Sequence, residues 1–200
     1  MEPEPTSRPV GRPRSEEADR KILDAARDLL VAYGYDRLRL EHVAKRAGVG
    51  KATIYRRWGS KEELAGALLE DLASPTVAIP DTGNAREEFT EVAINTINAL
   101  ADTPYGPVIR ALLSQIAINP RLGNPFRASV VEARRRQVAA IVERGIARGE
   151  LKPETESLNI AEMLVGPVYY RLIFGGSLDR TFVDEIVTGL LNGCGASRPR

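Results

Sequence analysis

Cysteine and histidine are almost absent from this 200-residue sequence, and their scarcity excludes several kinds of protein. Cys194 has no second cysteine with which to form an intramolecular disulfide. Together with the single histidine, His42, it cannot supply the ligands of a structural zinc site, so we expect no metal site. The sequence also lacks a serine–histidine–aspartate set, a paired-carboxylate motif and a phosphate-binding loop. We therefore expect a protein that is not an enzyme and needs no cofactor.

Long hydrophobic runs are also missing. The most apolar stretch, Leu158–Phe174, is interrupted by Asn159, Glu162 and Arg171, whereas a membrane-spanning helix needs about 20 consecutive apolar residues. The N-terminal residues contain no apolar run of the kind found in signal peptides. We expect a cytoplasmic protein with no membrane partner.

Net charge is small, at +1, but the charges are unevenly distributed along the chain. Residues 37–61 include eight basic residues and one acidic residue, a net of +7, whereas residues 74–200 contain fourteen of each. The positive charge is therefore concentrated in one short segment. Such a segment favours a nucleic-acid partner even though the whole chain is nearly neutral.

Apolar residues recur at helical spacing through most of the chain, with no strand-like alternation. We predict an all-α fold, with an N-terminal three-helix helix-turn-helix DNA-binding domain followed by a C-terminal helical bundle, about nine helices in total. The expected segments are a disordered basic arm (1–14), the helix-turn-helix domain (15–60), a connecting helix (61–73), a linker (74–84) and the C-terminal domain (85–200). The helices expected in that last domain span 85–102, 105–118, 124–148, 155–175 and 178–193.

The segment Leu40–Trp58 has the spacing of a helix-turn-helix. Ala44 and Ala47 are small enough for two helices to cross closely, and Gly48 can adopt the left-handed conformation that ends the first of them. Ser60–Glu63 then forms a capping box that begins the next helix. The second helix of the motif would bury Ile54 and expose Lys51, Ala52, Thr53, Tyr55, Arg56 and Arg57, a surface that suits a DNA major groove.

The run AKRAGVGKATIYRRWGSKEEL, residues 44–64, resembles the DNA-binding signature of the TetR family of bacterial transcriptional repressors. The resemblance covers roughly residues 15–70, and Ala147–Leu151 and Val165–Arg171 are similar to segments of an actinobacterial-type branch of that family. It implies a homodimer whose C-terminal domains, here residues 85–200, bind a small ligand that releases operator DNA. We therefore predict a ligand-responsive transcriptional regulator, a repressor, whose partners are a palindromic double-stranded DNA operator and an unknown small-molecule effector.

The same resemblance assigns roles to residues near the recognition helix. It implies that Lys51, Ala52 and Arg56 contact base edges, and that Thr53, Tyr55 and Lys61 contact phosphates. A guanine is the base expected to face Arg56. Gly50 and Arg39 stand where family members usually have hydroxyl residues; glycine is an adequate N-cap, and Arg39 can reach a phosphate.

The N-terminal arm contains the run Val10–Arg14, which resembles an AT-hook core. Arg12 and Arg14 of this run are candidates to enter the narrow minor groove of A·T-rich DNA, where the potential is most negative. The alternative is that the arm is a disordered, solubilising tail.

In the C-terminal domain the sequence supplies candidates for two further sites. The candidate ligand pocket consists of Leu113, Ile116, Phe126, Met163 and Tyr170, for which ordinary core packing is the alternative. The candidate dimer interface consists of Tyr169, Leu172, Ile173, Val183, Ile186, Val187, Leu190 and Leu191, for which burial within one chain is the alternative. Arg134, Arg135 and Arg136 are expected on a solvated helix face.

A second function shares every N-terminal feature described above. An architectural or nucleoid-associated DNA-binding protein would need the same helix-turn-helix and the same concentrated positive charge. It would differ in having a filled C-terminal core and no small-molecule effector.

Overall fold

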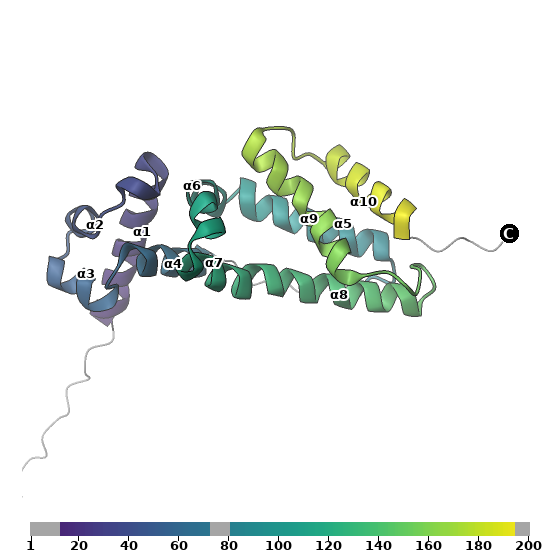
Figure 1. The fold of residues 1–200 in the computed structure, drawn as a ribbon, viewed down its shortest axis with the longest axis horizontal. Helices are drawn as coiled ribbons and strands as arrows, with labels where there is room; N and C mark the ends of the chain where they lie inside the picture. Colours follow the sequence, from purple (N-terminus) through teal and green to yellow (C-terminus); the bar gives the residue numbers. More distant parts are fainter. Residues whose placement is uncertain (1–12, 73–80, 195–200) are drawn as a thin grey trace, which may run out of the picture. The chain divides into compact units, whose positions relative to one another are not determined.

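The computed structural model describes residues 13–72 and 81–194, and the regular elements in these two ranges are all helices (Figure 1). The all-α prediction is therefore confirmed. The chain divides into two compact units, an N-terminal unit of residues 1–68 and a C-terminal unit of residues 69–200. The elements that begin in the N-terminal unit are α1 (Pro13–Tyr33), the 3-10 helix η1 (Tyr35–Arg37), α2 (Leu40–Ala47), α3 (Lys51–Arg57) and α4 (Lys61–Leu72).

The helices α1 to α4 of the N-terminal unit share a small apolar core. One side of α1 packs on α2, which in turn packs on α3. Ile22 and Leu30 of α1, Val43 of α2, Ile54 of α3 and Leu64 of α4 are all completely buried. Burying a side chain of this size stabilises the fold by about 1.5–3 kcal/mol, so α3 is held in place chiefly by Ile54, its one fully buried residue.

The turn between α2 and α3 has the geometry that the sequence predicts. Gly48 follows α2 with φ 68° and ψ 29°, in the left-handed region that favours glycine. The Val49 backbone N–H donates to the Ala44 carbonyl at 3.0 Å, which satisfies one of the free carbonyls at the helix end. The chain therefore turns sharply at Gly48 and begins α3 three residues later.

The helix boundaries at the N-terminus differ slightly from the prediction. Helix α1 begins at Pro13, two residues before the expected boundary at Ser15. Proline is well tolerated in the first turn of a helix because its missing N–H would be unbonded there anyway. The rest of the predicted arm lies outside the described residues.

The C-terminal unit is a bundle of longer helices. Its elements are α5 (Ala85–Ala101), α6 (Tyr105–Ile118), α7 (Pro120–Phe126), the π-helical segment η2 (Arg127–Val131), α8 (Glu132–Ala147), α9 (Ser157–Phe174) and α10 (Arg180–Cys194). Helix α5 lies against α8, α9 and α10, so it occupies the centre of the unit. Phe89 and Val92 of α5 and Leu164 of α9 are completely buried in this core.

The single helix predicted over 124–148 is longer and less regular in the structure. It begins at Pro120, because the Asn119 side chain caps the helix by accepting from the Arg121 backbone N–H at 3.0 Å. Pro125 has no N–H to donate within the helix, and the five residues after Phe126 follow a π-helical pattern before α8 begins. The prediction was wrong about the start of this helix and about its uniformity.

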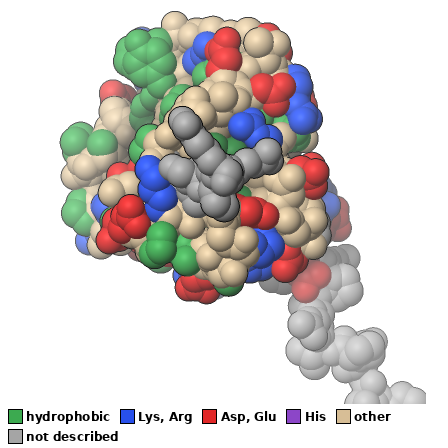
Figure 2. Space-filling model, turned by 90° about the vertical axis from the view of Figure 1, so that its right-hand side faces the viewer, with side chains coloured by type: hydrophobic (Ala, Val, Ile, Leu, Met, Phe, Trp, Pro, Cys, Tyr) green, Lys and Arg blue, Asp and Glu red, His purple; other side chains and the backbone are tan. Residues whose placement is uncertain are grey.

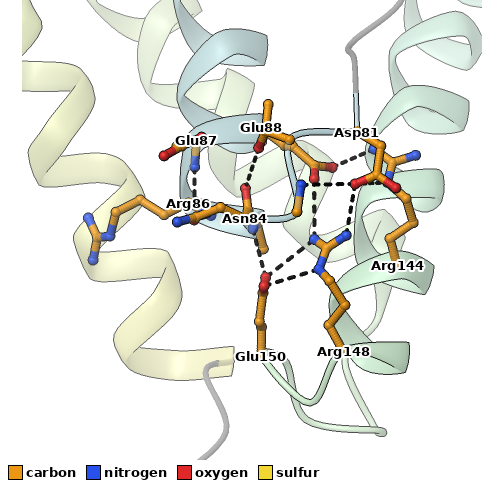
Figure 3. Close-up of polar contacts among 11 residues, drawn as sticks. Asp81, Asn84, Arg86, Glu87, Glu88, Arg144, Arg148 and Glu150 are labelled. Carbon is orange, nitrogen blue, oxygen red and sulfur yellow. Dashed lines mark hydrogen bonds and ion pairs between the residues drawn. The ribbon is translucent and has the colours of Figure 1, made fainter.

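A polar network ties the start of α5 to the end of α8 (Figure 3). Glu88 is completely buried, and both Arg144 and Arg148 pair with its carboxylate, the latter at 3.2 Å. Arg148 also pairs with Asp81 and Glu150, each at 3.0 Å. Because every carboxylate in the network has a cationic partner, the buried charge of Glu88 is compensated.

Charge on the surface of the molecule is mixed where Figure 2 shows it. Acidic and basic side chains alternate over that face, and hydrophobic side chains are scattered among them. None of the described helices is long and apolar enough to cross a membrane.

Candidate nucleic-acid interface

Helix α3 has one buried side and one exposed side. Ile54 is completely buried, whereas Lys51, Ala52, Tyr55 and Arg56 are exposed. Neither Lys51 nor Arg56 forms an ion pair with any described residue. Two cations, a small side chain and a phenol hydroxyl therefore project from the helix, and Thr53 is partly buried beside them.

Arg57 differs from this pattern. The sequence predicts it on the exposed side, but its side chain is only 17% exposed and pairs with Asp19 of α1. Residue 57 lies three positions after Ile54 and so on the same side of the helix, a relation that the sequence could have revealed. Arg57 therefore joins α3 to α1, and the prediction that it faces solvent was wrong.

The Tyr55 hydroxyl is engaged by a carboxylate of α2. It donates to Glu41 Oε1 at 2.6 Å. This hydrogen bond raises the pKa of Tyr55 and lowers the pKa of Glu41. To donate to a DNA phosphate, the hydroxyl would exchange one anionic acceptor for another, with little change in its own hydrogen bonding.

Lys61 is held near the start of α4 by an aromatic ring. Its Nζ lies 4.2 Å from the centroid of Tyr35, whose side chain is buried and whose hydroxyl donates to Glu62 Oε1 at 2.9 Å. Burial, and then the bond to Glu62, raise the pKa of Tyr35. A cation over a ring face is favourable by about 0.5–1 kcal/mol at an exposed site, so the ammonium is oriented before any ligand arrives.

The capping box that begins α4 is confirmed. Ser60 Oγ accepts from the Glu63 backbone N–H at 3.2 Å, and Glu63 Oε2 accepts from the Gly59 N–H at 2.9 Å. These bonds fix the first turn of α4 and with it the position of Lys61.

For the other residues predicted to contact DNA, Arg39, Arg14 and Arg12, the structure gives less detail. Arg39 precedes α2 and is exposed, with no side-chain bond to the helix that it caps. Arg14 lies in the first turn of α1. Arg12 lies outside the described residues. The structure thus brings the predicted residues of α3 and α4 onto one small unit and leaves the arm unplaced.

Comparison with known proteins identifies this arrangement. Residues 22–68 match the family model of bacterial regulatory proteins of the tetR family, and residues 79–190 match that of the tetracyclin repressor-like C-terminal domain. The chain belongs to the TetR family. Its members are transcriptional regulators that bind DNA and are not enzymes, as the sequence analysis predicted.

Individual TetR-family proteins resemble this chain over nearly their whole length. The uncharacterized HTH-type transcriptional regulator YdeS of Bacillus subtilis is 31% identical over 94% of each chain. The DNA-binding transcriptional repressor TetR of Mycobacteroides abscessus is 30% identical over 89% of this chain and 94% of its own. The fold is shared with NalD, the secondary repressor of the MexAB-OprM multidrug efflux pump in Pseudomonas aeruginosa, with a TM-score of 0.73, 16% identity, and coverage of 90% of this chain and 98% of NalD.

The residues predicted to line a ligand pocket in this TetR-family regulator are not all buried. Leu113, Ile116 and Phe126 are partly buried. Met163 and Tyr170 are 54% and 63% exposed, so they lie on the outer surface of α9 in place of the expected interior. The exposed Tyr170 ring lies 4.9 Å from that of Phe174, one helical turn further along.

Tyr169 has the opposite placement. The sequence predicts it at the dimer interface. In the structure its side chain is partly buried, and its hydroxyl lies next to Tyr105 and Arg134. Adjacent residues of a helix point about 100° apart, so a small error in the predicted orientation of α9 exchanges the environments of Tyr169 and Tyr170.

The remaining predicted interface residues divide into two groups. Val183, Val187 and Leu190 of α10 are buried in the core of the unit itself, so the alternative of burial within one chain holds for them. Ile173 is 41% exposed, and Phe174, which the prediction omitted, is 72% exposed. The residues with intermediate exposure are Leu172, Ile186 and Leu191.

Proposed function

We propose that this DNA-binding regulator is a ligand-responsive repressor that binds a palindromic operator as a homodimer. The observation that carries the proposal is the division of cations on α3. Arg57 is used to hold the helix, whereas Lys51 and Arg56 project from it without an ion pair among the described residues. Unpaired cations on an exposed helix are available for DNA at no cost in broken salt bridges.

Reading of bases and binding of phosphates are assigned to different residues. The Arg56 guanidinium can donate two hydrogen bonds to O6 and N7 of a guanine, and Lys51 and Ala52 lie one turn earlier on the same helix. Lys61, Arg39, Thr53 and Tyr55 are assigned to the phosphates on either side. Contacts of the second kind fix the position of the helix but carry no sequence information.

Two copies of the chain would present two recognition helices to successive major grooves. A surface for this pairing is available on α9 and α10, where Ile173 and Phe174 are exposed and Leu172, Ile186 and Leu191 are partly exposed. Large apolar side chains that remain exposed on a single chain are typical of association surfaces. A two-fold dimer of this kind requires a palindromic site.

An effector would act by binding one dimer conformation more tightly than the other. Suppose the effector favours a spacing of the two DNA-binding units that does not fit one turn of DNA. Effector binding then lowers operator affinity, and operator binding lowers effector affinity by the same factor. We assign the repressor direction because relatives of this chain are named as repressors.

The arm is assigned to the minor groove next to each half-site, through Arg12 and Arg14. Deletion of residues 1–12 should weaken binding most for operators with A·T-rich flanks. Equal weakening for all flanks would favour a solubilising tail instead.

The proposal can be tested by selecting binding sites from random double-stranded DNA with the purified full-length protein. We expect a palindromic consensus whose half-sites lie about one helical turn apart, 10–10.5 base pairs or a multiple of it. Enrichment of no sequence, or of a single unpaired half-site, would contradict specific binding by a dimer. The matched control is Arg110→Ala, which removes an exposed arginine of the C-terminal unit and should select the same consensus.

A further inference from the structure

Three consecutive arginines near the start of α8 have three different environments. Arg135 pairs with Glu132 at 2.6 Å and with Glu162 at 3.1 Å, and Arg136 is exposed. Arg134 is partly buried, and within the described residues it donates a hydrogen bond to a neutral acceptor, Gln137 Oε1, at 2.7 Å. No carboxylate in the described parts of the chain pairs with it. Arg134 therefore carries a partly buried positive charge that no carboxylate of the described residues neutralises.

Two tyrosine hydroxyls from other helices lie beside this guanidinium. Tyr105 of α6 is 5% exposed, and its hydroxyl interacts with Arg134 and with the hydroxyl of Tyr169 on α9. It makes no hydrogen bond of normal geometry within the described residues. Burial lowers the pKa of Arg134 and raises the pKa of both tyrosines. Three helices thus bring together one cation and two hydroxyl groups that can donate.

This cluster is costly for the protein when it stands alone. A buried charge without a partner costs several kcal/mol, and a buried hydroxyl without a hydrogen bond costs about 1–3 kcal/mol. In the Glu88 network of the same unit, by contrast, the charges of two arginines are compensated by a carboxylate. Around Arg134 the described residues supply hydrogen-bond donors and one neutral acceptor, Gln137, but no carboxylate.

We propose that Arg134, Tyr105 and Tyr169 form the anion-binding end of the effector site, and that the effector is a monocarboxylate with an apolar body. The proposal rests on the proposed function, in which the C-terminal unit binds an effector. A carboxylate can accept two parallel hydrogen bonds from a guanidinium and further ones from phenol hydroxyls. The single positive charge of the cluster matches a monoanion better than a phosphate dianion.

The apolar body follows from the residues next to the cluster. Ile109 lies one turn after Tyr105 and Val138 one turn after Arg134, on the same sides of their helices, and both are buried. Beyond the polar groups the interior is therefore hydrophobic. A molecule with a carboxylate at one end and a hydrocarbon or aromatic body would satisfy both parts.

The proposal is tested by thermal unfolding of the full-length protein in straight-chain carboxylates of increasing length, from acetate to octanoate, and in the matching primary amides. We expect the carboxylates to raise the unfolding temperature, more so with chain length, and the amides to have at least about 10-fold weaker effects, as expected for loss of a charged hydrogen-bond partner. Equal effects of each carboxylate and its amide, or no effect of either series, would overturn the proposal.

Variants of the cluster test whether stabilisation by carboxylates depends on Arg134 and Tyr169. Arg134→Met should leave the ligand-free protein equally or more stable and should abolish the carboxylate effect, whereas Arg136→Gln, an exposed neighbour, should retain it. If Arg134→Met does not fold, Tyr169→Phe should weaken carboxylate binding about 5–10-fold, the loss expected for one hydrogen bond. Unchanged carboxylate binding in Tyr169→Phe and in any folded Arg134 variant would overturn the proposal.

The outcome is separable from that of the proposed function. Stabilisation by carboxylates that depends on Arg134 but leaves DNA affinity unchanged would support the anion site and contradict ligand-responsive repression. Normal binding to a palindromic operator without any carboxylate effect would do the reverse, supporting the DNA-binding proposal and refuting the anion site.

Discussion

The two units of this chain differ in how many of their cations are paired around the sites described above. In the N-terminal unit Arg57 pairs with Asp19 and joins α3 to α1, and Lys51 and Arg56 on the exposed side of α3 form no ion pair with a described residue. In the C-terminal unit Arg144 and Arg148 are both tied to Glu88. Arginine is therefore architectural at Arg57, Arg144 and Arg148, whereas Arg56 of the N-terminal unit is exposed and is the arginine we assign to DNA.

The difference shows why net charge is a poor guide to function in this protein. Acidic and basic residues are equal in number in residues 74–200, and the structure joins many of them to one another. Within residues 37–61 only part of the positive excess is compensated: Arg46 and Arg57 pair with aspartates of α1, whereas Lys51 and Arg56 form no ion pair with a described residue. A nearly neutral chain can therefore bind DNA, with a salt dependence set by the few cations that reach phosphates.

The largest expected effect is on stability, from removal of the buried carboxylate of Glu88. Glu88→Ala leaves Arg144 and Arg148 without their buried partner, and we expect it to lower the free energy of unfolding by about 3–5 kcal/mol. Chemical denaturation monitored by circular dichroism measures this change. Glu91→Ala, an exposed carboxylate on the same helix, is the matched control and should change stability by less than about 0.5 kcal/mol. A loss below about 1 kcal/mol for Glu88→Ala would show that the network contributes little.

Removing the Arg56 side chain should lower operator affinity without changing the stability of the fold. We expect Arg56→Ala to cost about 1–3 kcal/mol of operator affinity and to relax the preference at one symmetric base pair. Lys61→Ala should weaken binding to all sequences alike and reduce the salt slope by about 1. Fluorescence anisotropy titrations with base-pair variants of the operator distinguish the two patterns. Identical patterns for both variants would refute the division between base and phosphate contacts.

Acidification should sharpen the comparison, because the Arg46–Asp28 ion pair of the N-terminal unit is exposed. The hydrogen bond from Arg46, at 2.8 Å, lowers the pKa of Asp28 from its ordinary value of 3.8. The stability that this pair contributes is full above the unfolded-state pKa and is lost as the pH falls through the lower folded-state value. We expect Asp28→Asn to cost less than about 1 kcal/mol near neutral pH and nothing in strong acid.

Urea denaturation of the wild type and the variant at several pH values measures this difference. Asp36→Asn removes an exposed carboxylate of the same unit and is the control. A cost for Asp28→Asn that persists or grows in acid would contradict the assigned role of the Arg46 pair.

The smallest expected effect concerns the start of the recognition helix. Gly50 precedes α3 with extended backbone angles and no side-chain cap, and a Cβ there would meet only Thr53 Oγ1, at 4.0 Å. Gly50→Ser should therefore stabilise the protein by a few tenths of a kcal/mol, measured by thermal unfolding. Gly48→Ser is the opposing control: its positive φ makes any side chain strained, so it should destabilise by about 1 kcal/mol. Destabilisation by Gly50→Ser would show that the cap position is not free.

The N-terminal unit was predictable because its signals are local. Gly48 and the Ser60–Glu63 capping box act within a few residues, and both have the expected geometry. Lys51 and Arg56 are exposed as predicted because they lie away from the one buried residue, Ile54. The spacing of Arg57 to Ile54 could have placed it on the buried side of α3, but its partner, Asp19, lies 38 residues away in sequence and only the fold brings the two together.

The C-terminal unit was predictable only in outline. Its helices are strongly apolar on more than one side, so periodicity does not decide which side meets the core. This explains why Tyr170 proved exposed and why Val183 and Val187 proved buried. The Arg134 cluster draws one residue from each of three helices, and no spacing along the chain reveals it.

The central claim is that α3 reads DNA in the major groove, and methylation interference at guanine N7 tests it most directly. N7 lies in the major groove, and Arg56 is assigned to a guanine there. The account predicts that methylation of a guanine in each half-site blocks binding of the wild type, and that Arg56→Ala loses this sensitivity. Binding that tolerates methylation at every guanine of the selected site, yet is displaced by a minor-groove ligand, would contradict it.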